Sequence, residues 1–147
     1  MTNAGRVLVL VIVALICTST ANANIRTKMG HPSRNCWWAQ VQVYREGVAT
    51  GDLWHLTERV NWCSGYKHLH IKYVSRVVSH WENPTWSFGG YDRSWGNHAS
   101  DYSWESRGIA ATFNGYTPTF LVEHNYPTLN IIVDADGYWT WRDSCGC

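Results

Sequence analysis

Beyond residue 24 the sequence lacks any helix-length amphipathic pattern, any internal repeat and any low-complexity tract. These absences exclude helical bundles and repeat architectures. What remains is a series of short alternating apolar and polar segments, separated by Gly, Asn, Asp and Pro, which is typical of an all-β domain. No second apolar span and no linker interrupts residues 24–147, so we expect a single domain there.

The chain also lacks an excess of charge of either sign. Setting aside Arg6, eleven of the twelve Lys and Arg remain against eleven Asp and Glu. A balanced, interspersed pattern argues against nucleic acid as a partner and against attachment to anionic lipid through a basic patch. There is no Asn-x-Ser/Thr sequon with a permissive middle residue, so we expect no N-glycosylation.

The first 23 residues have the features of a cleaved signal peptide. Arg6 precedes an unbroken apolar run at 7–16, and residues 21–23 are the Ala-Asn-Ala that a signal-peptidase cut requires. The run is too short for a membrane anchor, which needs roughly 18 apolar residues. Lipoprotein acylation at Cys17 is the alternative, but its upstream neighbours fit that signal poorly. We therefore expect a mature chain that begins at Asn24, secreted or exposed on the cell-envelope exterior, with no membrane segment.

Four cysteines remain after cleavage: Cys36, Cys63, Cys145 and Cys147. An even number in an oxidising compartment suggests disulfides, and four cysteines allow three connectivities. A bond between Cys145 and Cys147 closes a very small ring, which would be strained and easily reduced. The alternatives for this pair are free thiols, bonds between chains, or a bond to one of the other two. We expect the pair to tie down the chain end.

A hairpin selects the preferred connectivity. Residues 37–45 and 53–63 both alternate, and a turn centred between Ala49 and Thr50 sets Trp37 opposite Trp62 on one apolar face. The same register sets Cys36 opposite Cys63 on the other face, which predicts a cross-strand disulfide.

Two further turns extend this pattern. A tight turn at 64–65 predicts a third strand whose apolar residues share the face of the first hairpin. This register places Leu69, Ile71 and Tyr73 opposite Val60, Glu58 and Leu56. Near the C-terminus, Ala135-Asp136-Gly137 predicts a three-residue turn that pairs Leu129, Ile131 and Val133 with Trp139 and Trp141. We expect Trp37, Trp62, Trp139 and Trp141 to lie on the core face.

The middle of the chain supplies the remaining strands, a shorter one around 85–88 and a longer one around 102–113. About seven short strands favour a small disulfide-stapled antiparallel β-sandwich, and a small β-barrel is the alternative.

Tryptophan is the conspicuous residue, with ten in the chain. Residues 82–101 are rich in Gly, Asn, Ser and Asp and show little strand character, and long irregular loops are often functional. Aromatic rings beside amides and charged groups suit saccharides, because each ring offers a flat apolar face and the polar groups bind hydroxyls. The candidate ligand-binding residues are Trp86, Tyr91, Asp92, Arg93, Trp95, Asn97, Tyr102 and Trp104. The alternative is that these rings cover an open end of the sandwich.

Metal sites receive little support. His68 and His70 share one face if they lie on one strand, but no third ligand is near. Residues 134–137, Asp-Ala-Asp-Gly, lack the further oxygen ligands of a calcium loop, and a turn explains them. We therefore expect no metal and no cofactor.

The hairpin places the carboxylate Glu58 on the apolar face, between Val41 and Ile71, where it must be paired, protonated or open to a cleft. A second carboxylate across a cleft, Glu105 or Glu123, would suggest glycoside hydrolysis. The alternative is a partner such as Arg107 or an error in the register. No serine or cysteine lies in a recognisable catalytic triad.

The aromatic, glycine-rich sandwich resembles secreted carbohydrate-binding modules in architecture and composition, and no motif transfers functional residues. We expect a secreted non-catalytic binding domain, with a polysaccharide as the ligand. The alternatives are a cell-surface structural or protein-interaction module and a small secreted hydrolase.

Overall fold

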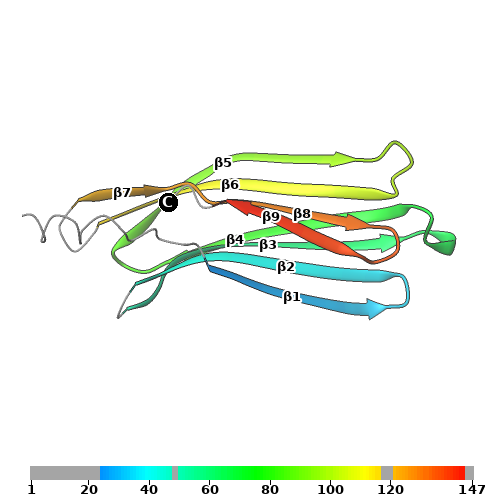
Figure 1. The fold of residues 1–147 in the computed structure, drawn as a ribbon, viewed down its shortest axis with the longest axis horizontal. Coiled ribbons are helices and arrows are strands. Elements are labelled where there is room, and N and C mark those ends of the chain that lie inside the picture. The colour runs from blue at the N-terminus through cyan, green and yellow to red at the C-terminus, as the bar shows by residue number, and fades with distance from the viewer. Residues whose placement is uncertain (1–23, 48–49, 117–120, 145–147) are drawn as a thin grey trace, which may run out of the picture.

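The computed structural model describes residues 24–47, 50–116 and 121–144 (Figure 1). The predicted signal segment and the pair Cys145 and Cys147 lie outside these residues. The elements are β1 (Asn24–Ser33), β2 (Cys36–Gly47), β3 (Gly51–Ser64), the 3₁₀ turn η1 (Tyr66–His68), β4 (Ile71–Glu82), β5 (Trp86–His98), β6 (Trp104–Tyr116), β7 (Val122–Asn125), β8 (Thr128–Asp134) and β9 (Trp139–Ser144). These described residues contain no helix that could span a lipid bilayer.

The strands form two antiparallel sheets that lie as two layers in Figure 1. The four-stranded sheet has the order β1-β2-β3-β4, and the five-stranded sheet has the order β5-β6-β8-β9, with β7 paired to β6 beyond the end of β8. The chain passes from one sheet to the other between β4 and β5. The predicted β-sandwich is confirmed, and the fold is not a closed barrel.

The core lies between the sheets because each strand alternates apolar and polar residues. The fully buried side chains include Trp54, Trp62, Phe113, Leu129 and Ile131. Two indole N–H groups also join the sheets, since Trp62 Nε1 donates to the Asp134 carbonyl and Trp54 Nε1 to Asn125 Oδ1, each at 2.9 Å. Buried tryptophans therefore contribute both apolar area and directional links between the layers.

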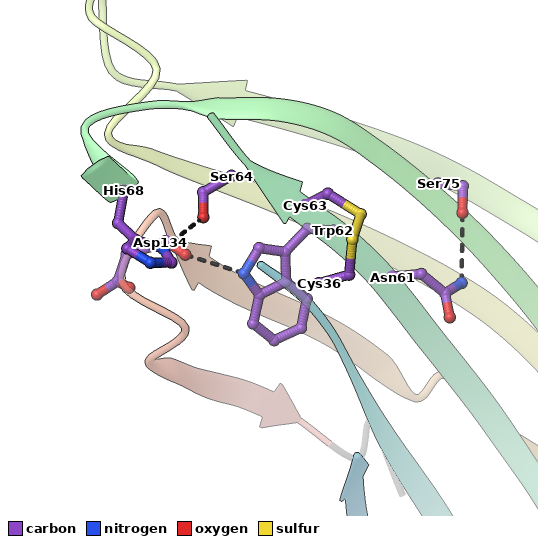
Figure 2. The surroundings of a disulfide bond; sticks show 8 residues. All are labelled: Cys36, Asn61, Trp62, Cys63, Ser64, His68, Ser75 and Asp134. Atoms are coloured by element: carbon purple, nitrogen blue, oxygen red, sulfur yellow. Dashed lines mark hydrogen bonds between the residues drawn. A yellow bond between two sulfur atoms is a disulfide. The ribbon is translucent and has the colours of Figure 1, made fainter. Parts of the chain in front are cut away.

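From Cys36 to Arg45 the hairpin of β2 and β3 has the predicted register, with Trp37 opposite Trp62 and Cys36 opposite Cys63. An irregularity between Arg45 and Glu46 shifts the pairs next to the turn by one residue. The Cys36–Cys63 disulfide is present. Figure 2 shows Trp62 pointing toward Asp134, while the adjacent disulfide lies on the other side of the strand. The alternation of a pleated strand explains how neighbouring residues serve the core and the covalent link.

The predicted register of the next hairpin is wrong. β4 pairs Val74 with Trp62 and Val78 with Glu58, because η1 lengthens the connection and replaces the expected two-residue turn. From Tyr73 onward the shift reverses the face that each β4 residue occupies, so Tyr73 is 56% exposed. Ile71 is buried as predicted, because a register irregularity separates its pairing from that of Tyr73. Arg76 instead lies opposite the buried Val60 and faces the second sheet.

The C-terminal hairpin has the predicted pairing, with Val133 opposite Trp139 and Ile131 opposite Trp141. Gly137 adopts a φ of +93°, as the turn requires. Trp139 packs against the core, but Trp141 is 37% exposed, so its prediction as a core residue is wrong. β9 is an edge strand, and the core does not extend over its far end.

The prediction of an irregular segment at 82–101 is also wrong, because most of it forms β5. Two β-bulges interrupt the strand, between Phe88 and Gly90 and between Tyr91 and Arg93. Each bulge adds one residue to one strand of a pair and shifts the alternation. Because of those shifts and the high content of Gly, Asn and Ser, the sequence of β5 does not show the alternation with a period of two residues that identifies a strand.

Candidate binding face and groove along strand β5

The predicted aromatic platform is partly assembled on the outer face of the five-stranded sheet. Arg93, Trp95 and Asn97 lie on β5 opposite Ala110, Gly108 and Ser106 of β6. These β6 residues alternate with the buried Ile109 and therefore point away from the core.

Trp95 lies over Gly108, where the absence of a side chain leaves room for the indole. A Cβ on Gly108 would come within 2.1 Å of the ring. The Arg93 guanidinium lies 5.1 Å from the Trp95 ring centroid, which places a cation against the aromatic system. A half-buried ring is thus fixed flat on the sheet, with polar groups beside it.

Polar side chains flank this ring. Asp92 accepts a 2.7 Å hydrogen bond from the Thr112 hydroxyl, and Asn97 Oδ1 accepts one from the His98 backbone N–H at 2.9 Å. Trp104 lies on the same β6 face as Gly108 and is 37% exposed. Four residues of strand separate the two positions, or about 13 Å at the usual rise. We call Asp92, Arg93, Trp95, Asn97 and Trp104 the β5–β6 face.

Three of the predicted residues lie elsewhere. Trp86 is only 6% exposed and packs against Trp54 in the core, so the prediction of an exposed ring is wrong for it. Tyr102 lies in the turn after β5, where it has a φ of +58° and its ring stacks on His98 with 4.3 Å between the ring centroids. Its carbonyl accepts a hydrogen bond from the Ile71 N–H. Tyr102 therefore lies at the end of the sandwich and not on the outer face of the sheet.

Tyr91 turns toward the other side of β5. Because it lies between the two bulges, its side chain reaches β4, where its hydroxyl shares a 3.3 Å hydrogen bond with His80 Nδ1. Partial burial raises the pKa of the Tyr91 hydroxyl above its usual value. Tyr91 therefore belongs to the space between the sheets and not to the outer face.

That space opens along β4 and β5 as a groove. One part, of about 370 Å³, is lined by Val74 and Arg76 of β4, Ser94, Trp95 and Gly96 of β5, and Arg107 of β6. The adjoining part, of about 540 Å³, is lined by Arg76, Val78, Tyr91, Asp92, Arg93, Ser94 and Ile109. We call the two parts the β4–β5 groove. Arg76 and Ser94 belong to both.

Glu58 lies close to this groove but does not line it. It has no exposed area, and Arg76 Nη1 is 3.7 Å from its Oε1, too far for a hydrogen bond. Desolvation raises the pKa of Glu58 to about 8, although the charges of Arg76 and Arg107 act in the opposite direction. At neutral pH Glu58 is therefore mostly protonated.

The other two carboxylates considered beside Glu58 have cationic partners of their own. Glu105 forms an ion pair with Arg107, and Glu123 forms one with Arg45. Arg107 is thus the partner of Glu105, and Arg76 is the closest cation to Glu58. Glu58, Glu105 and Glu123 therefore do not form a pair of accessible carboxylates across an aromatic cleft.

The histidines proposed to share a strand face do not lie on one. His68 belongs to η1 and His70 precedes β4. The His68 Nδ1 lies 2.8 Å from the Ser64 hydroxyl, as Figure 2 shows. Across residues 24–47, 50–116 and 121–144 no three His, Cys, Asp or Glu side chains are grouped as metal ligands. Asp134 Oδ1 accepts hydrogen bonds from the Asp136 and Tyr138 N–H groups, which accounts for the acidic turn.

The sequence did not predict Arg76 as a site residue. The predicted register of β4 placed it on the solvent face, and the observed register turns it inward. The available signal was an isolated arginine in the apolar segment that contains Val74, Val77 and Val78.

Comparison of this chain with protein-family models, curated proteins and solved structures gave no match.

Proposed function

We propose that this protein is an exported, non-catalytic domain that binds polysaccharide on the β5–β6 face. The observation that carries the proposal is the flat placement of Trp95 over Gly108, with Arg93 against the ring. A tryptophan held in this way offers an indole surface without a further ordering cost at the moment of binding.

The chemistry of the face suits a sugar chain. An indole presents a flat apolar surface to the C–H side of a pyranose, and neighbouring amide, carboxylate and guanidinium groups bind hydroxyls. Asn97, Asp92 and Arg93 supply these groups beside Trp95, and Trp104 supplies a second ring along β6. The separation of the two rings favours an extended ligand over a single sugar.

Binding without catalysis fits the described carboxylates better than hydrolysis. Glu58 has no exposed area, and Glu105 and Glu123 are engaged with arginines. A glycosidase needs an acid and a second carboxylate on either side of one scissile bond. The Cys36–Cys63 disulfide is compatible with an oxidising, extracellular compartment, and the predicted signal peptide would deliver the chain there.

The test is a binding screen of the oxidised mature chain against insoluble cellulose, chitin, xylan and peptidoglycan by pull-down. Trp95→Ala and Trp104→Ala should each weaken binding by roughly tenfold or more, because each removes a stacking surface. Tyr73→Ala is the control, since Tyr73 is an exposed aromatic on the outer face of the other, four-stranded sheet. Binding that is lost in all three variants, or that appears with none of the polymers, would contradict the proposal.

A second candidate, a protein-interaction module, is favoured by one observation. Tyr73, Val77 and Trp81 alternate along β4 and are 56%, 58% and 45% exposed. This apolar strip lies on the outer face of the four-stranded sheet. If it is the functional surface, Val77→Lys should abolish concentration-dependent association in sedimentation experiments, whereas Trp95→Ala should leave it unchanged.

A further inference from the structure

The β4–β5 groove carries a cation, Arg76, whose hydrogen-bonding capacity is only partly used by the protein. Arg76 extends from β4 toward the five-stranded sheet, where its Nη1 donates a 2.9 Å hydrogen bond to the Gly108 carbonyl. Its side chain is 26% exposed and lines both parts of the groove. A guanidinium has five N–H donors in a planar fork, which matches a carboxylate or sulfate group.

The groups around Arg76 leave its charge without an anionic partner at neutral pH. Arg107, from β6, is paired with Glu105. From β3, Glu58 approaches within 3.7 Å, and neither of its buried oxygens has a hydrogen-bond partner. The strands β2 and β8 present apolar residues toward Glu58, among them its pairing partner Val41 and the buried Ile131.

The rim of the groove adds few competing charges. Tyr91 and Ser94 contribute hydroxyls, and His80 is engaged with the Tyr91 hydroxyl. Arg93 adds a second cation, and the one carboxylate of the lining, Asp92, accepts a hydrogen bond from Thr112. The groove is therefore polar, open and cationic, whereas most of the space between the sheets is filled by apolar side chains.

We propose that the β4–β5 groove is an anion-binding site, in which Arg76 holds a carboxylate or sulfate group and the charge state of Glu58 sets the affinity. The groove shares Asp92, Arg93 and Trp95 with the β5–β6 face. Arg76 and Glu58 are not part of that face, so the proposal does not depend on polysaccharide binding there. Because the two surfaces meet along β5, an acidic sugar chain that crosses this edge strand would reach both.

Glu58 controls the affinity for the anion because its carboxylate competes with the ligand for the Arg76 guanidinium. While Glu58 is protonated, the charge of Arg76 is available to an incoming anion. Once Glu58 ionises, the groove contains a fixed negative charge close to Arg76, and a second anion is repelled. By linkage, a bound anion must also favour the protonated form of Glu58, so binding takes up a proton near the pKa of about 8.

The experiment is a titration of the ¹³C,¹⁵N-labelled oxidised chain with sodium sulfate and with sodium acetate, followed by carbonyl and Cα chemical shifts detected on carbon, which do not require amide protons at high pH. The two buffers are at about pH 7 and about pH 9.5, above the ordinary range of histidines and on either side of the Glu58 pKa. We expect saturable shifts at Ser94 and Gly96. The dissociation constant should be roughly tenfold weaker at the higher pH, because a unit charge is added close to the cation.

Two variants and a control decide the outcome. Glu58→Gln should bind sulfate with the same affinity at both pH values, and Arg76→Gln should lose the shifts at Ser94 and Gly96. Arg142→Gln, on the exposed face of β9, should behave as the wild type. Two results would overturn the proposal: chemical-shift changes near every surface arginine, or a pH dependence of the affinity that persists in Glu58→Gln. Because Glu58→Gln tests the pH dependence by itself, the proposal can be decided even if Arg76→Gln fails to fold. Oligogalacturonate and a sulfated oligosaccharide, tested next, distinguish carboxylate from sulfate as the natural group.

Discussion

Asn125 and Glu58 are both buried polar side chains with no exposed area, yet their surroundings differ. Asn125 Oδ1 accepts hydrogen bonds from Trp54 and Arg45 at 2.9 Å each, and its Nδ2 donates to Glu123. Glu58 has two oxygens without a hydrogen-bond partner and a guanidinium that is too distant to bond. Each side-chain polar atom of Asn125 has a hydrogen-bond partner, and neither carboxyl oxygen of Glu58 has one.

The difference follows from the position of each residue in the sandwich. Asn125 ends β7, where β3 and the five-stranded sheet close over Trp54, Trp86 and Phe113. Glu58 lies in the middle of β3, beside the edge strand β4, where the sheets separate into the groove. A satisfied network fixes one arrangement, whereas an unsatisfied carboxyl stays sensitive to pH and to nearby charge.

The largest effect should appear in the stability of Glu58→Gln as a function of pH. The raised pKa means that the folded state keeps the Glu58 proton up to about pH 8, whereas the unfolded chain releases it near the usual value of 4.5. The wild type should therefore lose stability relative to Glu58→Gln as the pH rises from 4.5 to 8. The total loss should reach about 4 kcal/mol in urea unfolding. Parallel pH profiles would show that Glu58 is already ionised in the folded protein.

Asn125→Ala should have the next largest effect. It removes the acceptor of Trp54 and Arg45 and leaves buried donors unpaired, which should lower the free energy of unfolding by about 3 kcal/mol. Asn97→Ala is the matched control on the exposed face of β5 and should change stability by less than about 0.5 kcal/mol. Equal losses of unfolding free energy in the two variants would mean that the buried hydrogen bonds of Asn125 stabilise the fold no more than an exposed asparagine does.

Tyr91→Phe should have the smallest effect. The Tyr91 hydroxyl shares its hydrogen bond with His80 at the half-open rim of the groove, and Tyr91 is 45% exposed. Water can replace the lost partner, so the expected change in stability is about 0.5 kcal/mol or less. A loss of unfolding free energy as large as that of Asn125→Ala, measured by the same urea titration, would show that the rim of the groove contributes to stability as much as the buried core does.

The parts of the fold that the sequence predicted depend on local information. The β2–β3 and β8–β9 hairpins have short turns, so the turn position and the alternation together determine which residues pair. The Cys36–Cys63 disulfide and the inward position of Glu58 follow directly from the first of these registers. The two buried indoles Trp37 and Trp62 follow as well.

The parts that the sequence did not predict depend on irregular backbone or on contacts between the sheets. The turn η1 changed the register of β4 and so the face of Arg76, and two bulges concealed β5. The β4–β5 groove lies between edge strands of different sheets, and no pattern within either strand specifies their separation. Three neighbouring candidates, Arg93, Trp95 and Asn97, do share a face, because alternation resumes after the second bulge.

The bulges of β5 also affect how copies of the protein meet. In the described part of the chain β5 is an edge strand, and a regular edge offers a row of unpaired N–H and C=O groups to any other strand. Each bulge adds a residue and increases the local twist, so the free groups of β5 do not match the spacing of a regular partner strand. The irregularity that hides β5 from its sequence pattern thus protects this aromatic-rich sandwich against edge-to-edge growth into fibrils.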